Sequence, residues 1–468
     1  MTQDVEGKRD SYVIYPRRFR WLKRGAAGFL LLLVALAGAR LAWDRSVESR
    51  FCEMAREARA RGEPFYAEDF RQLPIPDDEN AMAPLLTAAD QLAKNKIVIP
   101  ESLNDYPTQV AALDMPVIDE LITRCHPELR LIRGARSRTK AVFAGAPTSH
   151  DLSHRLPHLY EYNDASHILA LAALEQRAKG NDGEALQCIR DILFLEDALE
   201  RADPSYLNAL VAMGMSSRAT SLTEQAAMDL QISENGSAAT HDQVRELIAI
   251  LLNEKNLQEC AVQGCFLERM AVVYILKSRL DRDMNWINMP SFEADALSLA
   301  ERDNSLAEGC QQADFQTAQK KFKPFREWYR VEGYVRPTYT RCGNPHRIVD
   351  EYFRALADRR GAATMLAIRL FAGEHQGKLP NTLAELVPGY LPAVPVDPFD
   401  PSRHTIQYAP QNNPPTLYSV GRDGKDDGGV WMQAPYWNDK DIIYCLVAQP
   451  RISPPRKPTT RRSTVPQK

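Results

Sequence analysis

Residues Leu417–Ile442 read LYSVGRDGKDDGGVWMQAPYWNDKDI, and this stretch carries the clearest structural signal in the chain. A short apolar segment runs into a loop that contains four glycines. The same stretch concentrates the candidate metal ligands, which are Asp423, Asp426, Asp427, Asp439 and Asp441. Hard cations such as calcium are coordinated by about six to eight oxygens, which carboxylates and the backbone carbonyls of a bent loop can supply. The composition therefore predicts a calcium-binding loop.

Three other interpretations of this loop can be compared with the calcium site. An EF-hand does not fit, because counting from Asp423 places Lys425 at the third position and Ala434 at the twelfth. A phosphate-binding loop does not fit either, since its acidity would repel the ligand. A solvated acidic turn remains the alternative, because Asp-Gly pairs are common in turns.

The chain before the loop predicts a helix followed by short strands. Residues 356–372 place apolar side chains on one helical face, namely Leu356, Ala363, Leu366 and Leu370. A short helix at Thr382–Val387 comes next, and several prolines then force an extended path. Two strands are expected at His404–Tyr408 and Thr416–Ser419, on either side of a Pro-Gln-Asn-Asn-Pro turn.

The order of these elements resembles the C-terminal half of the major pseudopilin of bacterial type II secretion. The matching motifs are a helix, G-x-L-P, L-x-E-L-V, L-P-x-V-P-x-D-P-F, a strand, Y-S-x-G-x-D-G and a final D-I, over about residues 350–446. The resemblance implies an α+β module in which a long helix packs on a small antiparallel sheet. It also implies a calcium ion that holds the last loop.

The resemblance assigns roles to individual aspartates. Asp423 corresponds to the acidic residue of G-x-D-G, and Asp439 and Asp441 correspond to the acidic pair before the final isoleucine. Asp426 and Asp427 match less closely. The segment 431–437 between them is longer and more aromatic than the family pattern.

The N-terminus predicts a membrane anchor. Residues 25–43 form an apolar stretch of about 19 residues, which is near the minimum for crossing a bilayer as a helix. Arg40 lies near one end, where its side chain can reach the interface, and Trp43 suits that interface. Residues 1–24 carry seven Lys/Arg against three acidic residues. The positive-inside rule then predicts a single-pass protein of the bacterial inner membrane, with a cytoplasmic N-terminus and an exported, periplasmic remainder.

Two kinds of processing compete with a retained anchor. The small residues at 35–37 fit a signal-peptide cleavage site, although the apolar stretch continues beyond them. Gly28 and its following Phe resemble a prepilin junction, but Leu33 occupies the position where that family has glutamate. We therefore expect a retained transmembrane helix.

Residues 46–345 are expected to form a helical exported domain. One face repeats at helical spacing through Val244, Leu247, Ile248, Leu251 and Leu252. Residues 168–199 predict two helices separated by Gly-Asn-Asp-Gly at 180–183. No fixed-period repeat is present, so an irregular bundle is favoured over a solenoid. The end of the chain, 449–468, contains six Lys/Arg, no acidic residue and five prolines, and predicts a disordered tail.

The helical part offers weak candidates for catalysis. Four histidines, His150, His154, His158 and His167, include spacings of four that could align imidazoles for zinc. Glu268 and Arg269 are adjacent in an apolar helix and predict a buried ion pair or, less simply, a site. No G-x-S-x-G or H-E-x-x-H motif is present. An exported hydrolase using His150, His154 and Glu268 is the competing enzyme hypothesis.

The overall composition limits the classes of binding partner that we expect. The chain has 468 residues with 58 basic and 61 acidic side chains, so bulk charge gives no reason to expect nucleic acid. Its eight cysteines include no C-x-x-C motif and leave any disulfide pairing open. We therefore expect a mainly α-helical, membrane-anchored protein with a calcium-stabilised module, acting in binding or scaffolding. Its expected partners are envelope or secretion-system proteins, and a component of a pilus-like assembly is a further alternative.

Overall fold

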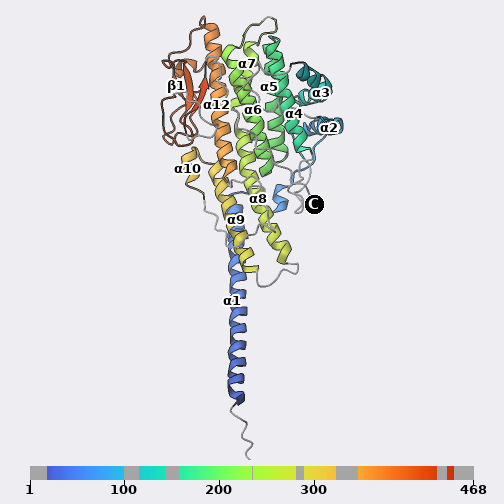
Figure 1. The fold of residues 1–468 in the computed structure, drawn as a ribbon, viewed down its shortest axis with the longest axis vertical. Coiled ribbons are helices and arrows are strands. Elements are labelled where there is room, and N and C mark those ends of the chain that lie inside the picture. The colour runs from blue at the N-terminus through green and yellow to red at the C-terminus, as the bar shows by residue number, and fades with distance from the viewer. Residues whose placement is uncertain are drawn as a thin grey trace, which may run out of the picture.

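The computed structural model describes residues 18–97, 99, 115–143, 158–234, 236–280, 289–322, 346–429 and 440–446. Figure 1 shows one long helix that leads into a head of packed helices, with a small sheet on one side of the head. The prediction of a mainly helical chain with a short antiparallel sheet is confirmed. The boundary proposed between residues 345 and 350 stays a prediction.

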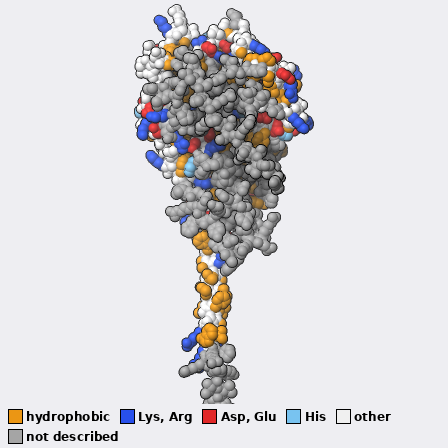
Figure 2. All heavy atoms as spheres, in the orientation of Figure 1, with side chains coloured by type: hydrophobic (Ala, Val, Ile, Leu, Met, Phe, Trp, Pro, Cys, Tyr) orange, Lys and Arg blue, Asp and Glu red, His pale blue; other side chains and the backbone are white. Residues whose placement is uncertain are grey.

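The long helix is α1, Arg18–Ala60, and its two halves have different surroundings. In the described part of the chain it is the helix that is long and apolar enough to cross a membrane. Its apolar half is exposed, and Figure 2 shows hydrophobic side chains covering this stalk. Its C-terminal part packs into the head through Val47, Phe51, Met54 and Ala58.

The head is built from helices of unequal length, some of which pack against their sequence neighbours, as α4 does on α5 and α8 on α9, and others against helices distant in sequence. They are η1 Ala67–Phe70, α2 Met82–Asn95, α3 Met115–Ala135, α4 Leu159–Ala178, α5 Asp182–Ala202, α6 Tyr206–Asp229, α7 His241–Leu252, α8 Lys255–Leu280, α9 Met289–Cys310 and α10 Phe315–Gln319. Capping side chains define where several of these helices begin. Ser205 accepts a hydrogen bond from the backbone N–H of Asn208 at the start of α6, and Thr240 forms a capping box with Gln243 at the start of α7.

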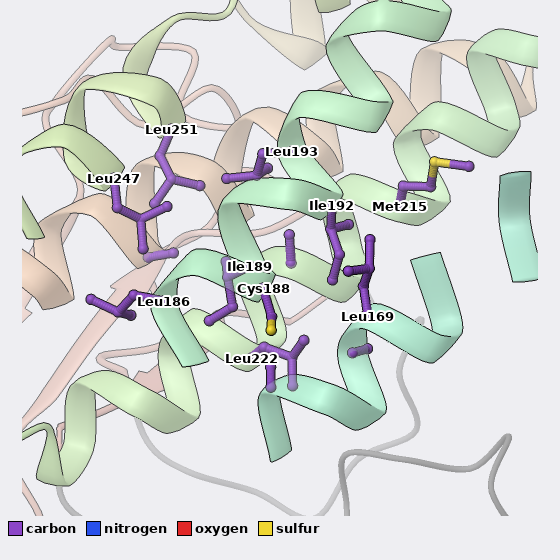
Figure 3. Close-up of a cluster of buried hydrophobic side chains, with 14 of the residues drawn as sticks. Leu169, Leu186, Cys188, Ile189, Ile192, Leu193, Met215, Leu222, Leu247 and Leu251 are labelled. Carbon is purple, nitrogen blue, oxygen red and sulfur yellow. The ribbon is translucent and has the colours of Figure 1, made fainter. Parts of the chain in front are cut away.

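The first core lies between α4, α5, α6 and α7. Figure 3 shows how its side chains meet, with Leu169 from α4, Ile189 and Ile192 from α5, Leu222 from α6 and Leu247 from α7. The helical face predicted for α7 is buried at Val244, Leu247, Ile248 and Leu251. The hairpin predicted around 180–183 is also present, since α4 ends at Ala178 and α5 begins at Asp182.

The second core lies between the end of α1 and helices α8, α9 and α10. Aromatic side chains occupy its centre, where the ring of Phe315 meets those of Phe353 and Phe399 at centroid distances of 5.6 and 5.2 Å. Such edge-to-face pairs add about 0.5–1.5 kcal/mol each beyond area burial. This core attaches the head to the stalk.

Helix α12, Arg347–Glu374, belongs to both cores. Its first half contributes Phe353 and Leu356 to the second core, and its second half contributes Ala363, Leu366 and Leu370 to the first. The predicted apolar face is therefore buried. Because α12 packs on α6 and α7 as well as on the sheet, the α+β part shares its main helix with the bundle.

The sheet has three antiparallel strands in the order β1–β2–β3. They are β1 Gln407–Ala409, β2 Thr416–Ser419 and β3 Ile442–Cys445, and the turn-like η5 Leu383–Leu386 precedes them. The second predicted strand matches β2, and the first is shifted toward the turn. Tyr444 of β3 lies against α12 at Gly361, where an added Cβ would come within 2.5 Å of the tyrosine ring. Glycine at this position therefore sets the close approach of helix and sheet.

Candidate functional site

The acidic loop follows β2, as the sequence pattern predicts, and leads to β3, which the pattern did not predict. It turns at Gly421 and Gly424, whose φ angles are +70° and +67°. A Cβ at Gly421 would lie 2.1 Å from the carbonyl oxygen of Lys440, so the two ends of the loop touch at this glycine. A positive φ and a close backbone approach both require glycine there.

The loop carboxylates bind the loop's own backbone. Asp441 accepts hydrogen bonds from the N–H groups of Asp427 and Gly429 at 3.2 and 2.8 Å. Asp423 accepts one from the N–H of Lys425 at 3.0 Å. Partial burial raises the pKa of the Asp441 carboxyl above its ordinary value, against the lowering effect of its two backbone hydrogen bonds, and the charges of Asp426 and Asp427 raise it further.

Asp426 ties the loop to the sheet. Its carboxylate accepts hydrogen bonds from the Gly428 N–H at 2.8 Å and from the Tyr418 hydroxyl at 3.1 Å. Tyr418 lies in β2, opposite Ile443 of β3. Asp426 therefore holds the loop over the sheet face.

Lys440 supplies a cation inside the loop, which the sequence reasoning did not anticipate. Its Nζ lies 3.0 Å from the carboxylate of Asp427. Its pKa is raised by that hydrogen bond and by the charges of Asp427, Asp423 and Asp441. The ammonium group therefore partly neutralises the same carboxylates that were predicted to bind calcium.

The described part of the chain contains no group of three or more His, Cys, Asp or Glu side chains that could hold a metal ion. Four of the five predicted ligands lie within it, and their positions are given above. Asp439 and the aromatic segment 431–437 lie outside the described residues. The calcium site therefore stays a prediction.

Asp397 binds the end of β2, where the acidic loop begins. It is completely buried, and it accepts hydrogen bonds from the Ser419 hydroxyl at 2.7 Å and from the N–H groups of Val420 and Phe399 at 2.8 and 2.9 Å. Burial raises the pKa of this carboxyl above its ordinary value, and the three hydrogen bonds only partly oppose that shift. The D-P-F motif seen in the sequence thus has a structural role in fixing β2 and the loop entrance.

The predicted histidine group is only partly described, because His150 and His154 lie outside the described residues. His158 precedes α4 and lies 2.8 Å from a carboxylate oxygen of Asp90. His167 lies 2.6 Å from Arg218, and burial together with this cation lowers its pKa to about 4. The two described histidines therefore have separate partners.

Arg269 and Glu268 are both buried, as predicted, but the ion pair that the structure shows for Arg269 is with Glu63, at 3.6 Å. The Arg269 guanidinium lies over the rings of Phe266 and Phe65, at 4.4 and 4.9 Å from their centroids, and donates to the backbone carbonyl of Pro64. These contacts join α8 to the turn after α1, which is a structural role. The enzyme hypothesis stays a prediction, because His150 and His154 lie outside the described residues.

The sequence analysis missed a buried polar group around Arg359. Arg359 of α12 donates to Glu196 of α5 at 2.9 Å and to the backbone carbonyls at the end of α7, those of Ile250, Leu251 and Asn253. A cation at a helix C-terminus interacts favourably with its unpaired carbonyls. Glu200, one turn after Glu196, is also buried. Carboxylates within the apolar stripe of α5 are the signal that would have found this group.

No protein-family model matches the chain, and comparison with curated proteins and with solved structures also found no match.

Proposed function

We propose that this protein is a membrane-anchored binding or scaffolding protein whose head stands at the bilayer surface. One observation carries the proposal, namely that α1 passes without a break from an exposed apolar half into the second core of the head. A helix fixed at both ends holds the head at a defined height. That arrangement serves the presentation of a binding surface near the membrane.

The same helix supports a retained anchor. The small residues at 35–37 lie near the middle of α1. The contacts of its packed half begin at Arg40 and continue at Val47 and Arg50. Cleavage at 35–37 would remove the apolar half and leave the packed half. In the proposal the N-terminal segment 1–24 is cytoplasmic, and the head is exported into the periplasm of a bacterial envelope.

Native Cys52 provides the test of this orientation, because it lies in α1 just beyond the apolar half and is exposed. Right-side-out and inside-out membrane vesicles would be treated with a membrane-impermeant maleimide, with Cys52→Ser as the matched control. We expect Cys52 to be labelled in right-side-out vesicles only. Labelling only in inside-out vesicles would reverse the orientation, and release of the full chain by alkaline carbonate would reject the anchor.

We further propose that the β2–β3 loop binds calcium and that this ion stabilises a pseudopilin-like module. The supporting observations are the antiparallel sheet packed on α12 and the position of Asp423, Asp427 and Asp441 around one loop. Calcium would replace repulsion among these carboxylates with shared coordination. An ion that binds only the folded loop stabilises the protein by about 2.7 kcal/mol at a hundred times its Kd.

The calcium test requires the full chain, because α12 also completes the bundle cores. Thermal melting in detergent would be recorded with calcium and with a chelator for the wild type and for Asp423→Ala. A rise in Tm that the variant lacks supports the metal loop. Equal Tm values with calcium and chelator in the wild type would contradict the metal site and favour the alternative, a solvated acidic turn held by Lys440. The partners would then be sought among envelope or secretion-system proteins by their binding to the anchored head.

A further inference from the structure

Two buried cysteines meet between helices α8 and α9. Cys265 of α8 is 1% exposed, and Cys310, the last residue of α9, is 0% exposed. Both are free thiols in the structure, and their side chains lie within hydrogen-bonding distance of each other. They are far apart in the sequence, so the contact arises from the packing of α8 against α9 in the second core.

A second contact shows that the same face of α8 is turned toward the end of α9. Gln258 precedes Cys265 by about two helical turns, which places both side chains on one face of α8. The side-chain amide of Gln258 donates a hydrogen bond to the backbone carbonyl of Cys310 at 3.1 Å. Two side chains of α8 therefore meet the same residue of α9.

Cys260 lies on α8 as well, but its surroundings are different. It is also 1% exposed, and burial raises the pKa of its thiol well above the ordinary value. The charges of Glu200 and Asp203 raise that pKa further, so carboxylates lie near this thiol. Cys260 is therefore a matched internal control for Cys265, equally buried on the same helix and facing other neighbours.

We propose that Cys265 and Cys310 are joined by a disulfide bond in the exported head. The inference rests on the proposed export, because disulfides form and persist outside the reducing cytosol. The oxidant is an external protein disulfide. A thiolate of one cysteine attacks that disulfide, and the thiolate of the other then attacks the mixed disulfide. Two electrons and two protons pass from the cysteines to the oxidant, which leaves as a dithiol.

Burial determines when this exchange takes place. Burial raises the pKa of the Cys265 thiol well above its ordinary value, and the adjacent Cys310 thiol raises it further. The thiolate is the form that reacts, so the exchange belongs to the stage before the second core closes. The folded head then shields the bond. We expect dithiothreitol to reduce it slowly in the native protein and rapidly in urea.

The bond would connect the anchor's contact helix to the rest of the second core. Glu293 of α9 pairs with Arg40 of α1 through two contacts of 3.0 Å. Glu301 of α9 pairs with Arg50 of α1 at 3.0 Å. A covalent link from α9 to α8 limits how far α9 can move away from the core, and the ion pairs pass that restraint to α1.

The test traps the thiols of the wild-type chain. Cells producing the full chain are quenched with trichloroacetic acid, and free thiols are alkylated with N-ethylmaleimide in denaturant without reductant. Trypsin releases Cys260 and Cys265 together in residues 256–269 and Cys310 in residues 303–320. We expect mass spectrometry to find these two peptides cross-linked, with the alkyl group on Cys260. Reduction before alkylation should separate them.

The outcomes distinguish the bond from the proposed export. Alkylation of both Cys265 and Cys310 without reduction rejects the bond. If Cys52 is then labelled from outside in the vesicle experiment, export is retained. If it is labelled only in inside-out vesicles, export fails as well. A cross-link of Cys310 to Cys260 or Cys342 instead would also overturn the proposed pairing.

Thermal melts of variants test the effect of the bond on stability. Dithiothreitol should lower the Tm of the wild type by several degrees, because the closed loop restricts the unfolded chain. Cys310→Ala should remove this dependence on dithiothreitol, whereas Cys260→Ala should keep it. Dependence that survives in Cys310→Ala would contradict the proposal. The trapping experiment uses the wild type, so it decides the question even if a variant does not fold.

Discussion

Arg359 of α12 and Glu196 of α5 form an ion pair of 2.9 Å that is enclosed by the bundle, with side chains 6% and 1% exposed. The remaining donors of Arg359 bind the carbonyl end of α7. One side chain thus connects three helices that are far apart in the sequence. If the Arg359 side chain is removed, Glu196 and the carbonyls of α7 cannot bind water instead. We therefore expect stability to depend more strongly on Arg359 than on other polar side chains described in the head.

Arg359→Met should lower the free energy of unfolding by about 3–5 kcal/mol, because it leaves a buried carboxylate and several carbonyls without a donor. The measurement is urea unfolding of the full chain in detergent. Arg347→Met, on the exposed end of the same helix, is the control and should cost less than about 1 kcal/mol. The double variant Glu196→Leu/Arg359→Met should recover part of the loss. A double variant less stable than Arg359→Met would contradict this account.

Glu200→Gln should change the pH dependence of stability. Burial raises the pKa of Glu200 well above its ordinary value and the pKa of Glu196 to about 7. A carboxyl with a raised pKa in the folded state keeps its proton at a pH where the unfolded chain has lost it. The contribution of Glu200 to the free energy of unfolding is therefore complete below the unfolded pKa of about 4.3 and is lost as the pH rises through the folded pKa.

The stability of Glu200→Gln relative to wild type should therefore grow from pH 5 to pH 8, by at most about 1.4 kcal/mol per pH unit. Urea unfolding at the two pH values measures this difference. Glu184→Gln, a more exposed carboxylate on the same helix, controls for the loss of one charge. A constant difference between Glu200→Gln and wild type across this range would argue that Glu200 is ionised in the folded protein.

Gly361→Ala should destabilise the contact between helix and sheet, since the new Cβ would overlap the Tyr444 ring. Overpacking of this kind costs about 1–3 kcal/mol. Gly373→Ala is the matched control on α12, where an added Cβ meets no atom within 4 Å. Because alanine favours helix over glycine, it should stabilise by about 0.5–1 kcal/mol. Thermal melts in which both substitutions shift Tm in the same direction would refute the close-approach argument.

Lys440→Met should make calcium bind at lower concentration, because it removes the ammonium group that neutralises Asp427, Asp423 and Asp441. Calcium titration monitored by Tm would show the midpoint. Lys425→Met removes an exposed charge from the same loop and serves as the control. If Lys440→Met destabilises the protein and calcium does not restore it, the lysine is the loop's cation and the metal proposal fails.

The sequence predicted local structure well where a repeating pattern was strong. The faces of α7 and of α12 were visible because Val244, Leu247, Leu366 and Leu370 recur at helical spacing and are buried as that spacing requires. The strand β3 was not predicted, although it has four residues like the predicted β2. Its identity as a strand comes from pairing with β2, which is a tertiary contact.

Long-range polar contacts could not be predicted in the same way. Arg359 and Glu196 are separated by 163 residues, and no local pattern links them. Arg40 was recognised as a charge near a membrane edge, but its partner Glu293 lies 253 residues away. The aspartates of the acidic loop were found because they are neighbours in sequence. Lys440 was among them, yet its role depends on how the loop folds back.

The shared helix α12 has a consequence for how the chain reaches its final state during synthesis. Residues of α6 find their main partner only when α12, more than a hundred residues later, has left the ribosome. Until then both cores expose apolar surface, and such non-local closure is slow and favours aggregation. A chain stopped before residue 347 would lack the helix that closes either core. We therefore expect the nascent head to expose apolar surface until α12 has been synthesised.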